Sequence, residues 1–265
     1  MTWVALGRHG LTASSSRALS CHWPSTVDGV GPPGEWDAEA EHWVAWARTP
    51  GHDAYWYYRD HFFNDLLPPP GHQTVEIGCG EGRVARDLSA HGHRVTGVDS
   101  SEKLVVYARR EDTRSCYLVA DGAALPFPDG RFDLAVAYNS LQVVSDMDKT
   151  VQEVSRVLGP GGRFCVCVAH PVTDLGRFMN GDPGAEFVLR EDYFARRRVE
   201  DRIEQGGLEV TVRGWTYTLE DYVAAFERSS LLIETLREPR PDRGSPRHQR
   251  WQRAPMFLML KARKA

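Results

Sequence analysis

The chain has 265 residues, 42% of them hydrophobic, which is enough to bury the core of one domain with an elaboration. A net charge of −4 gives no overall positive field, so no nucleic-acid partner is expected. No apolar run approaches the length that crosses a membrane, so no membrane association is expected either. The five cysteines lack paired zinc spacing, which predicts reduced buried thiols, no metal site and a cytoplasmic location.

The composition changes along the chain and suggests three parts. Residues 1–34 are rich in serine, proline and glycine without a sustained apolar period, which predicts a flexible N-terminal arm. Residues 35–70 are dense in aromatic side chains and predict two helices, separated at Pro50-Gly51 and ended by a proline run. Residues 71–265 are expected to form the main domain.

From Thr74 onward, predicted strands and helices alternate. The strands are expected at 74–79, 94–98, 117–120, 134–138 and 163–169, and the helices at 83–90, 102–110 and 149–158. This order predicts an α/β fold in which helices cover both faces of a parallel sheet. After residue 170 the alternation stops. A β-ribbon is then expected over 199–212, a helix capped by Thr218 over 219–229, and two last strands at 233–236 and 256–260.

A glycine loop follows the first predicted strand. Gly78-Cys79-Gly80-Glu81-Gly82 precedes an amphipathic helix, and Asp99 ends the second strand about 20 residues later. Glycines let the backbone approach a ligand above a helix N-terminus, and the carboxylate can accept hydrogen bonds from ribose hydroxyls. This spacing alone also allows NAD, although Arg83 stands where a dinucleotide loop has its third glycine.

Three further motifs follow in order: ADGAALPF at 120–127, FDLAV at 132–136 and VSRVLGPGG at 154–162. With the glycine loop, they make residues 74–168 resemble the class I S-adenosylmethionine-dependent methyltransferases, in the small-molecule branch that includes ubiquinone and menaquinone methyltransferases. The resemblance implies a seven-stranded Rossmann-like, doubly wound sheet, mostly parallel with an antiparallel edge strand. It also implies N-terminal helices, a substrate-lid insert over 171–217 after the fifth strand, and S-adenosylmethionine as cofactor.

The resemblance also assigns a cofactor site. The glycine-loop backbone is expected to meet the methionine portion and ribose, Asp99 to hold the ribose hydroxyls, and Asp121 to accept from the adenine amino group. Tyr138 and Asn139 are expected beside the transferable methyl group. The full cofactor-binding set is Glu76, Gly78, Cys79, Gly80, Asp99, Ser100, Asp121, Gly122, Ala123, Tyr138 and Asn139.

The acceptor is expected between the N-terminal helices and the insert, where the common core is uncovered. His52 and His170 are the candidate bases, since histidine titrates near neutral pH and a base is needed only if the acceptor loses a proton. Aromatic rings can sandwich a planar acceptor or face the sulfonium charge, although a stripe of them also packs a core. The candidate substrate-binding residues are Tyr55, Tyr58, Tyr193, Phe194 and Trp215. The basic runs at 196–198 and 237–253 are interpreted as solvated faces, because acidic neighbours neutralise them.

Several functions stay open at this point. The leading hypothesis is methyl transfer by direct displacement to the oxygen, nitrogen or carbon of a small aromatic or heterocyclic metabolite, as in secondary metabolism. A nucleic-acid or protein methyltransferase is disfavoured by the negative net charge and by the absence of Asn-Pro-Pro-Tyr after the fourth strand. A protein that retains the cofactor without methylating and an NAD-dependent oxidoreductase are further alternatives. The aromatic helices could also support a homodimer.

Overall fold

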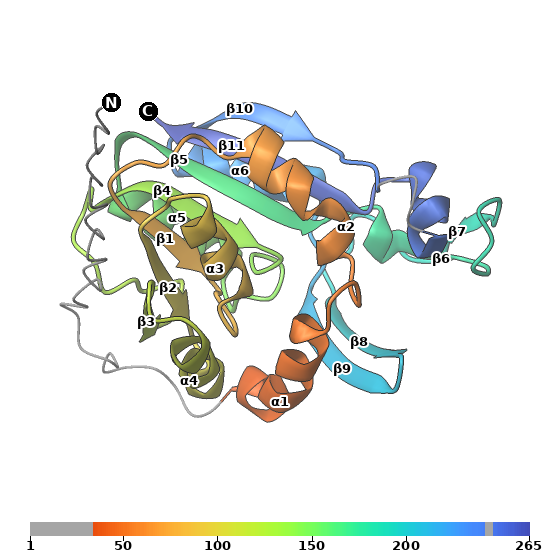
Figure 1. The fold of residues 1–265 in the computed structure, drawn as a ribbon. Helices are drawn as coiled ribbons and strands as arrows, with labels where there is room; N and C mark the ends of the chain where they lie inside the picture. Colours follow the sequence, from red (N-terminus) through yellow and green to blue (C-terminus); the bar gives the residue numbers. More distant parts are fainter. Residues whose placement is uncertain (1–33, 242–245) are drawn as a thin grey trace, which may run out of the picture.

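The computed structural model describes residues 34–241 and 246–265. The predicted arm, residues 1–34, therefore lies outside the described residues except for Gly34. At the centre of the fold is a seven-stranded sheet in the order β10-β11-β5-β4-β1-β2-β3 (Figure 1). The strand order reverses between β1 and β4, which is where doubly wound sheets bind ligands.

Five strands of this sheet are parallel, and β11 runs antiparallel between β5 and β10. The strands are β1 (Thr74–Ile77), β2 (Val95–Asp99), β3 (Cys116–Val119), β4 (Phe132–Tyr138), β5 (Leu158–Ala169), β10 (Leu231–Arg237) and β11 (Phe257–Lys264). The predicted mostly parallel sheet with one antiparallel strand is confirmed, although that strand is predicted at the edge. The antiparallel strand itself lies one place in from the edge.

Helices flank the sheet, and those before β1 lie at the carboxyl ends of its strands. They are α1 (Glu35–Arg48), α2 (Tyr55–Asp60), the π-helix η1 (His61–Leu66), α3 (Arg83–Ala90), α4 (Glu102–Glu111), α5 (Met147–Val157), α6 (Leu219–Arg228) and the 3-10 helices η2 (Thr173–Leu175) and η3 (Pro246–Gln252). The N-terminal aromatic segment breaks around Gly51, where φ is 68°. Thr218 caps α6 in a reciprocal capping box with Asp221, as the sequence predicts for this helix start.

Apolar side chains pack against both faces of the sheet. One layer joins β4 and β5 to α5 and α6 through residues such as Val154, Phe164 and Phe226. The other joins β2, β3, β4 and β5 to α2, η1, α3 and α4 through residues such as Phe62 and Leu88. Each fully buried side chain of this size contributes about 1.5–3 kcal/mol, so the two layers hold the strand ends rigidly.

The insert between β5 and α6 carries two small hairpins, β6–β7 (Gly176–Phe178, Phe187–Leu189) and β8–β9 (Arg198–Gln205, Leu208–Trp215). The sequence predicts the second but not the first, whose three-residue strands are too short to show a period. Strand β9 lies beside α1 (Figure 1), where the Thr211 amide donates to Glu39 Oε2 at 3.4 Å. Near the ribbon tip, the Gln205 side-chain amide donates to the carbonyl of His52. The ribbon and α1 therefore form one continuous wall.

Membrane, metal and cysteine expectations can be compared with the described part of the chain. Within it, no helix is long and apolar enough to span a membrane, and no cluster of three or more histidine, cysteine or acidic side chains could hold a metal ion. Cys79, Cys165 and Cys167 are free and buried. Cys116 is disulfide-bonded, so the prediction of reduced thiols is wrong at that position.

Candidate functional site

A cavity of about 1000 Å³ lies at the carboxyl ends of the central strands. One side is formed by the glycine loop and the ends of β2, β3 and β4. The other walls come from the segment joining α1 to α2, the β8–β9 ribbon and η3. The cavity is therefore enclosed by the N-terminal helices and the insert, as expected for a site between them.

The glycine loop requires residues without side chains. Gly78 has φ 69°, and an added Cβ would lie 2.5 Å from the Cβ of Ser140. Gly80 has φ 54°, and an added Cβ would lie 3.2 Å from Nε1 of Trp43. Left-handed backbone and close neighbours both favour glycine here, so the loop leaves its backbone open to the cavity.

Asp99 ties the glycine loop to the end of β2. Its Oδ2 accepts from the Gly80 amide at 2.8 Å, and its Oδ1 accepts from the Ser101 amide at 2.9 Å. Each carboxylate oxygen can accept a second hydrogen bond, so ribose hydroxyls could still bind. Burial raises the pKa of Asp99, against the lowering effect of the two amides. The helix cap that follows is Ser101, whose Oγ accepts from the Leu104 amide.

Two more acidic residues lie under and beside the loop. Glu76 is 2% exposed, and its Oε2 has no hydrogen-bond partner among residues 34–241 and 246–265. Burial, and then the charge of Asp99, raises the pKa of Glu76 well above its usual range. Asp121 Oδ1 accepts from the Ala123 amide at 2.9 Å. Asp121, Gly122 and the exposed Ser100 line the cavity, whereas Ala123 is buried beside it.

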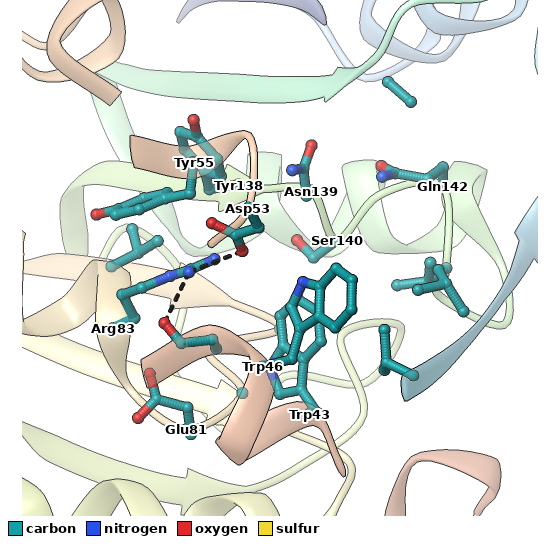
Figure 2. A pocket seen from close by; sticks show the side chains of 18 of the residues that line it. Trp43, Trp46, Asp53, Tyr55, Glu81, Arg83, Tyr138, Asn139, Ser140 and Gln142 are labelled. Atoms are coloured by element: carbon teal, nitrogen blue, oxygen red, sulfur yellow. Dashed lines mark hydrogen bonds and ion pairs between the residues drawn. The ribbon is translucent and has the colours of Figure 1, made fainter. Parts of the chain in front are cut away.

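Tyr138 and Asn139 lie at the end of β4, in the middle of the cavity wall (Figure 2). Asn139 adopts φ 55°, a left-handed conformation that asparagine tolerates better than most residues. Its backbone amide donates to the Cys167 carbonyl at 2.7 Å, while its buried side-chain Oδ1 has no protein partner in the described structure. Tyr138 packs edge-on against Tyr55 at 5.3 Å between ring centroids, and burial raises its pKa well above the usual value.

An ion pair that the sequence analysis does not identify lies between the cofactor and acceptor sides. Figure 2 shows Arg83 reaching Asp53 below Tyr55 and Tyr138, and the Arg83 Nη1 to Asp53 Oδ2 distance is 2.9 Å. The guanidinium carbon lies 4.0 Å from the centroid of the Tyr55 ring. Burial raises the pKa of Asp53, although Arg83 opposes this. The sequence feature that could have identified this ion pair is Arg83, which stands where a dinucleotide-binding loop has its third glycine.

Of the acceptor-side candidates, His52 and Tyr55 line the cavity. The His52 ring packs edge-on against Trp46 at 4.4 Å between centroids, and its buried Nε2 has no hydrogen-bond partner within the described chain. The Tyr55 hydroxyl donates to Asp87 Oδ2, so this residue presents its ring rather than its hydroxyl. Both residues therefore present a ring to the cavity.

His170 and Tyr58 do not lie on the cavity lining. The Val172 amide donates to His170 Nδ1 at 3.1 Å, and His170 Nε2 lies 2.9 Å from Glu238 Oε1, so both ring nitrogens are engaged. Burial lowers the pKa of His170, with Glu238 acting in the opposite direction. Tyr58 is completely buried and packs against Phe257 at 4.9 Å between ring centroids. The geometry thus gives His170 and Tyr58 structural roles.

The three aromatic candidates from the insert also lie off the cavity. Tyr193 accepts a hydrogen bond at its hydroxyl from the Leu219 amide, at the start of α6. Phe194 is 82% exposed. Trp215 packs against the core layer of α5 and α6, and its amide donates to the Gln142 carbonyl at 2.8 Å. These three rings therefore lie off the cavity, although the sequence analysis expects them to contact the acceptor.

Other residues line the acceptor side instead. From α1 come Trp43 and Trp46, whose rings face Ser140 in Figure 2, and from the β8–β9 ribbon come apolar side chains such as Val210. The segment η3 supplies Arg250 and Trp251. Arg250 belongs to the basic run interpreted as a solvated face, so that interpretation is wrong at this position.

The residues on the cofactor side fit an adenosyl sulfonium. A glycine loop that an added Cβ would obstruct provides close backbone approach, and Asp99 and Asp121 place acceptors at the ends of β2 and β3. The buried Glu76 oxygen without a protein partner in the described ranges provides a further acceptor. Acidic groups around the cavity also complement the positive charge of such a ligand.

Comparisons with known proteins agree with this geometry. Residues 75–166 match the model of the methyltransferase domain family. The chain is 37% identical over 182 residues to the 27-O-demethylrifamycin SV methyltransferase of Amycolatopsis mediterranei, covering 62% of this chain and 67% of that protein. It is 32% identical over 149 residues to the malonyl-[acyl-carrier protein] O-methyltransferase of Erwinia pyrifoliae, covering 56% of this chain and 55% of that protein. The chain thus spans about half the length of the latter relative.

A solved structure extends the likeness beyond the motifs. The S-adenosylmethionine-dependent methyltransferase from Mesorhizobium loti superposes with a TM-score of 0.64 and 28% identity, over 80% of this chain and 98% of that one. The fold, the glycine loop with its two acidic partners, and the relatives all indicate the same group of proteins. The chain belongs to the class I S-adenosylmethionine-dependent methyltransferases.

Proposed function

We propose that this protein transfers a methyl group from S-adenosylmethionine to an oxygen of a small molecule with an aromatic or heterocyclic ring. The observation that carries the proposal is that one cavity joins the cofactor residues Gly78, Gly80 and Asp99 to a wall of tryptophan and tyrosine rings. Both relatives described above are named as methyltransferases of oxygen positions, which supports oxygen as the acceptor atom.

The bound sulfonium supplies an already activated methyl group. The chain therefore has to align the acceptor atom behind that carbon and to exclude water, which can lower the barrier by several kcal/mol without a covalent intermediate. Tyr138 and Asn139 stand at the end of β4, between the cofactor side and the aromatic wall. The acceptor ring would lie against Trp43, Trp46 and Tyr55, where aromatic contacts orient a planar molecule.

Two groups on the cavity could take the proton of an acceptor hydroxyl. His52 Nε2 and Asp53 Oδ1 are both buried and have no hydrogen-bond partner in the described part of the chain. The carboxylate of Asp53 is held by Arg83, which fixes its orientation, and burial raises the pKa of Asp53 while Arg83 opposes that rise. We infer that one of these adjacent residues acts as the base, whereas both nitrogens of His170 are engaged away from the cavity.

The experiment is incubation of the purified protein with S-adenosylmethionine labelled on its methyl carbon, together with a panel of planar phenols and N-heterocycles. Transfer of label to an acceptor supports the proposal, and product analysis identifies the methylated atom. Binding of S-adenosylhomocysteine without any transfer over the panel would favour a protein that retains the cofactor without methylating. Absence of S-adenosylhomocysteine binding would refute the cofactor site itself.

The preference for small molecules can be tested in the same assay. RNA, DNA and protein extracts should receive no label above the background of heat-treated enzyme, because the chain has a net negative charge. Methylation of an acyl-carrier-protein substrate would instead extend the likeness to the Erwinia relative.

A further inference from the structure

Charged side chains are unevenly distributed around the cavity. The acidic residues on its lining are Asp53, Glu76, Glu81, Asp99 and Asp121, and all of them come from the α1–α2 connection or the ends of β1, β2 and β3. The two arginines on the lining differ in their surroundings. Arg83 is neutralised by Asp53, whereas Arg250 lies in η3, which precedes β11.

Arg250 stands on the opposite side of β4 from the cofactor residues. The start of β11 pairs with the end of β5, since Phe257 is opposite Ala169 in the antiparallel register. The segment η3 therefore lies at the same carboxyl edge of the sheet as the glycine loop, but on the side of β5 and β11.

Within the described part of the chain, the guanidinium of Arg250 is held in place by contacts but has no acidic partner. Its Nη1 donates to the Asn180 carbonyl at 3.0 Å, and its carbon lies 5.6 Å from the centroid of the Phe178 ring. Trp251 packs edge-on against the same ring at 4.9 Å between centroids. Across residues 34–241 and 246–265, Arg250 forms no ion pair with a carboxylate, and its buried Nε has no hydrogen-bond partner. A half-buried cation with spare donors, facing a ligand cavity, is a ready anion subsite.

We propose that Arg250 binds a carboxylate of the acceptor, so that the acceptor is an aromatic acid whose anionic group lies on the β11 side of β4, away from the atom that is methylated. This inference rests on the proposed function and specifies its substrate class. The charge distribution is complementary on both sides, since the acidic side meets the sulfonium and Arg250 meets the anion. The planar guanidinium can form two parallel hydrogen bonds with a carboxylate, which fixes the acceptor's direction in the cavity.

The test uses a matched pair of probes, 6-hydroxy-2-naphthoate and its neutral carboxamide, with binding measured by calorimetry in the presence of saturating S-adenosylhomocysteine. The two probes share a ring and a hydroxyl across the ring from the varied group. We expect the wild-type protein to bind the acid about ten-fold more tightly than the amide, as a charge-assisted pair implies. Arg250→Gln should abolish this preference, and Arg250→Lys should retain part of it.

The matched control is Arg253→Gln. Arg253 lies three positions further along the chain, is exposed and outside the cavity lining, and donates to the Ala185 carbonyl. This variant should keep the wild-type preference for the acid. Affinity for S-adenosylhomocysteine should be unchanged in all variants, and this also reports that they are folded.

The outcomes separate the two proposals. If the wild-type protein binds S-adenosylhomocysteine but does not prefer the acid, whether both probes bind equally or neither binds, the role of Arg250 is refuted and the cofactor site stands. A preference for the acid that survives Arg250→Gln also refutes it. Failure to bind S-adenosylhomocysteine concerns the proposed function, whatever the naphthoate result.

Discussion

Replacing Gly78 by alanine tests whether the geometry of the glycine loop is needed for cofactor binding. The substitution places a side chain at φ 69°, which costs an L-residue about 1–2 kcal/mol. The new Cβ would also lie 2.5 Å from the Cβ of Ser140. The two carbons must separate by roughly 1 Å to reach ordinary contact, and overpacking of this kind costs about 1–3 kcal/mol. The free energy of unfolding should therefore fall by about 2–5 kcal/mol.

Gly161 provides a control with the same backbone requirement and no clash. Its φ is 73°, and no atom lies within 4 Å of an added Cβ. Gly161→Ala should lower the free energy of unfolding by only about 1–2 kcal/mol. Urea denaturation of both variants measures the difference. Calorimetry should show that S-adenosylhomocysteine binds at least about ten-fold more weakly to Gly78→Ala and normally to Gly161→Ala, because only the first displaces the loop.

A second substitution identifies the cause. Ser140→Gly removes the Cβ that the new methyl group would meet, so it should restore part of both stability and affinity in the Gly78→Ala background. Ser140 also donates to the Ile77 carbonyl, so recovery should be incomplete. The reasoning is refuted if the two glycine variants lose equal stability, or if Gly78→Ala binds S-adenosylhomocysteine as the wild type does.

Three further predictions concern charged groups. Asp99→Asn should weaken S-adenosylhomocysteine binding in calorimetry by about 1.5–3 kcal/mol, because hydrogen bonds to a charged carboxylate are lost, and unchanged affinity would contradict its role. Arg83→Met should destabilise the protein by about 3–5 kcal/mol in urea unfolding at pH 8, since it leaves the buried carboxylate of Asp53 unpaired, whereas adding Asp53→Asn should recover much of this loss. Strictly additive losses would exclude that coupling. Burial, and then the charge of Asp201, raises the pKa of Asp174 from 3.8 to about 6. The neutral form of Asp174 therefore contributes fully to the free energy of unfolding below pH 3.8, and this contribution is lost as the pH rises through 6. Asp174→Asn should therefore stabilise the protein increasingly from pH 4 to pH 8, by at most about 3 kcal/mol. A constant difference over that range would argue against it.

The cofactor side of the site could be predicted because its residues lie at the ends of consecutive strands. The helix predicted over 83–90 is α3 with the same bounds, and the loop before it has the positive φ values that its glycines suggest. Asp99 ends β2 and Asp121 follows β3, and the parallel pairing of the two strands brings those ends to one edge of the sheet. Local sequence and sheet topology together are therefore sufficient to predict where these residues lie.

The acceptor side depends on contacts between segments far apart in the chain, and residue type does not reveal them. The β8–β9 ribbon is placed by the Thr211 amide on Glu39 and by Gln205 on the carbonyl of His52, over 150 residues away. An aromatic residue in the insert can equally contact the acceptor, pack in the core or face solvent, and Trp215 and Phe194 take the last two positions.

The same reasoning explains why one arginine of a basic run became part of the cavity. In the sequence, Arg250 and Arg253 are equivalent members of a charged segment. Only the antiparallel return of β11 against β5, which delivers η3 to the carboxyl edge, places the first on the cavity and leaves the second exposed. On the proposed function, the common strands determine where the methyl donor binds, while the position of the last hairpin determines which charge an acceptor meets. Acceptor specificity can thus change through the insert and η3 without disturbing Gly78 or Asp99.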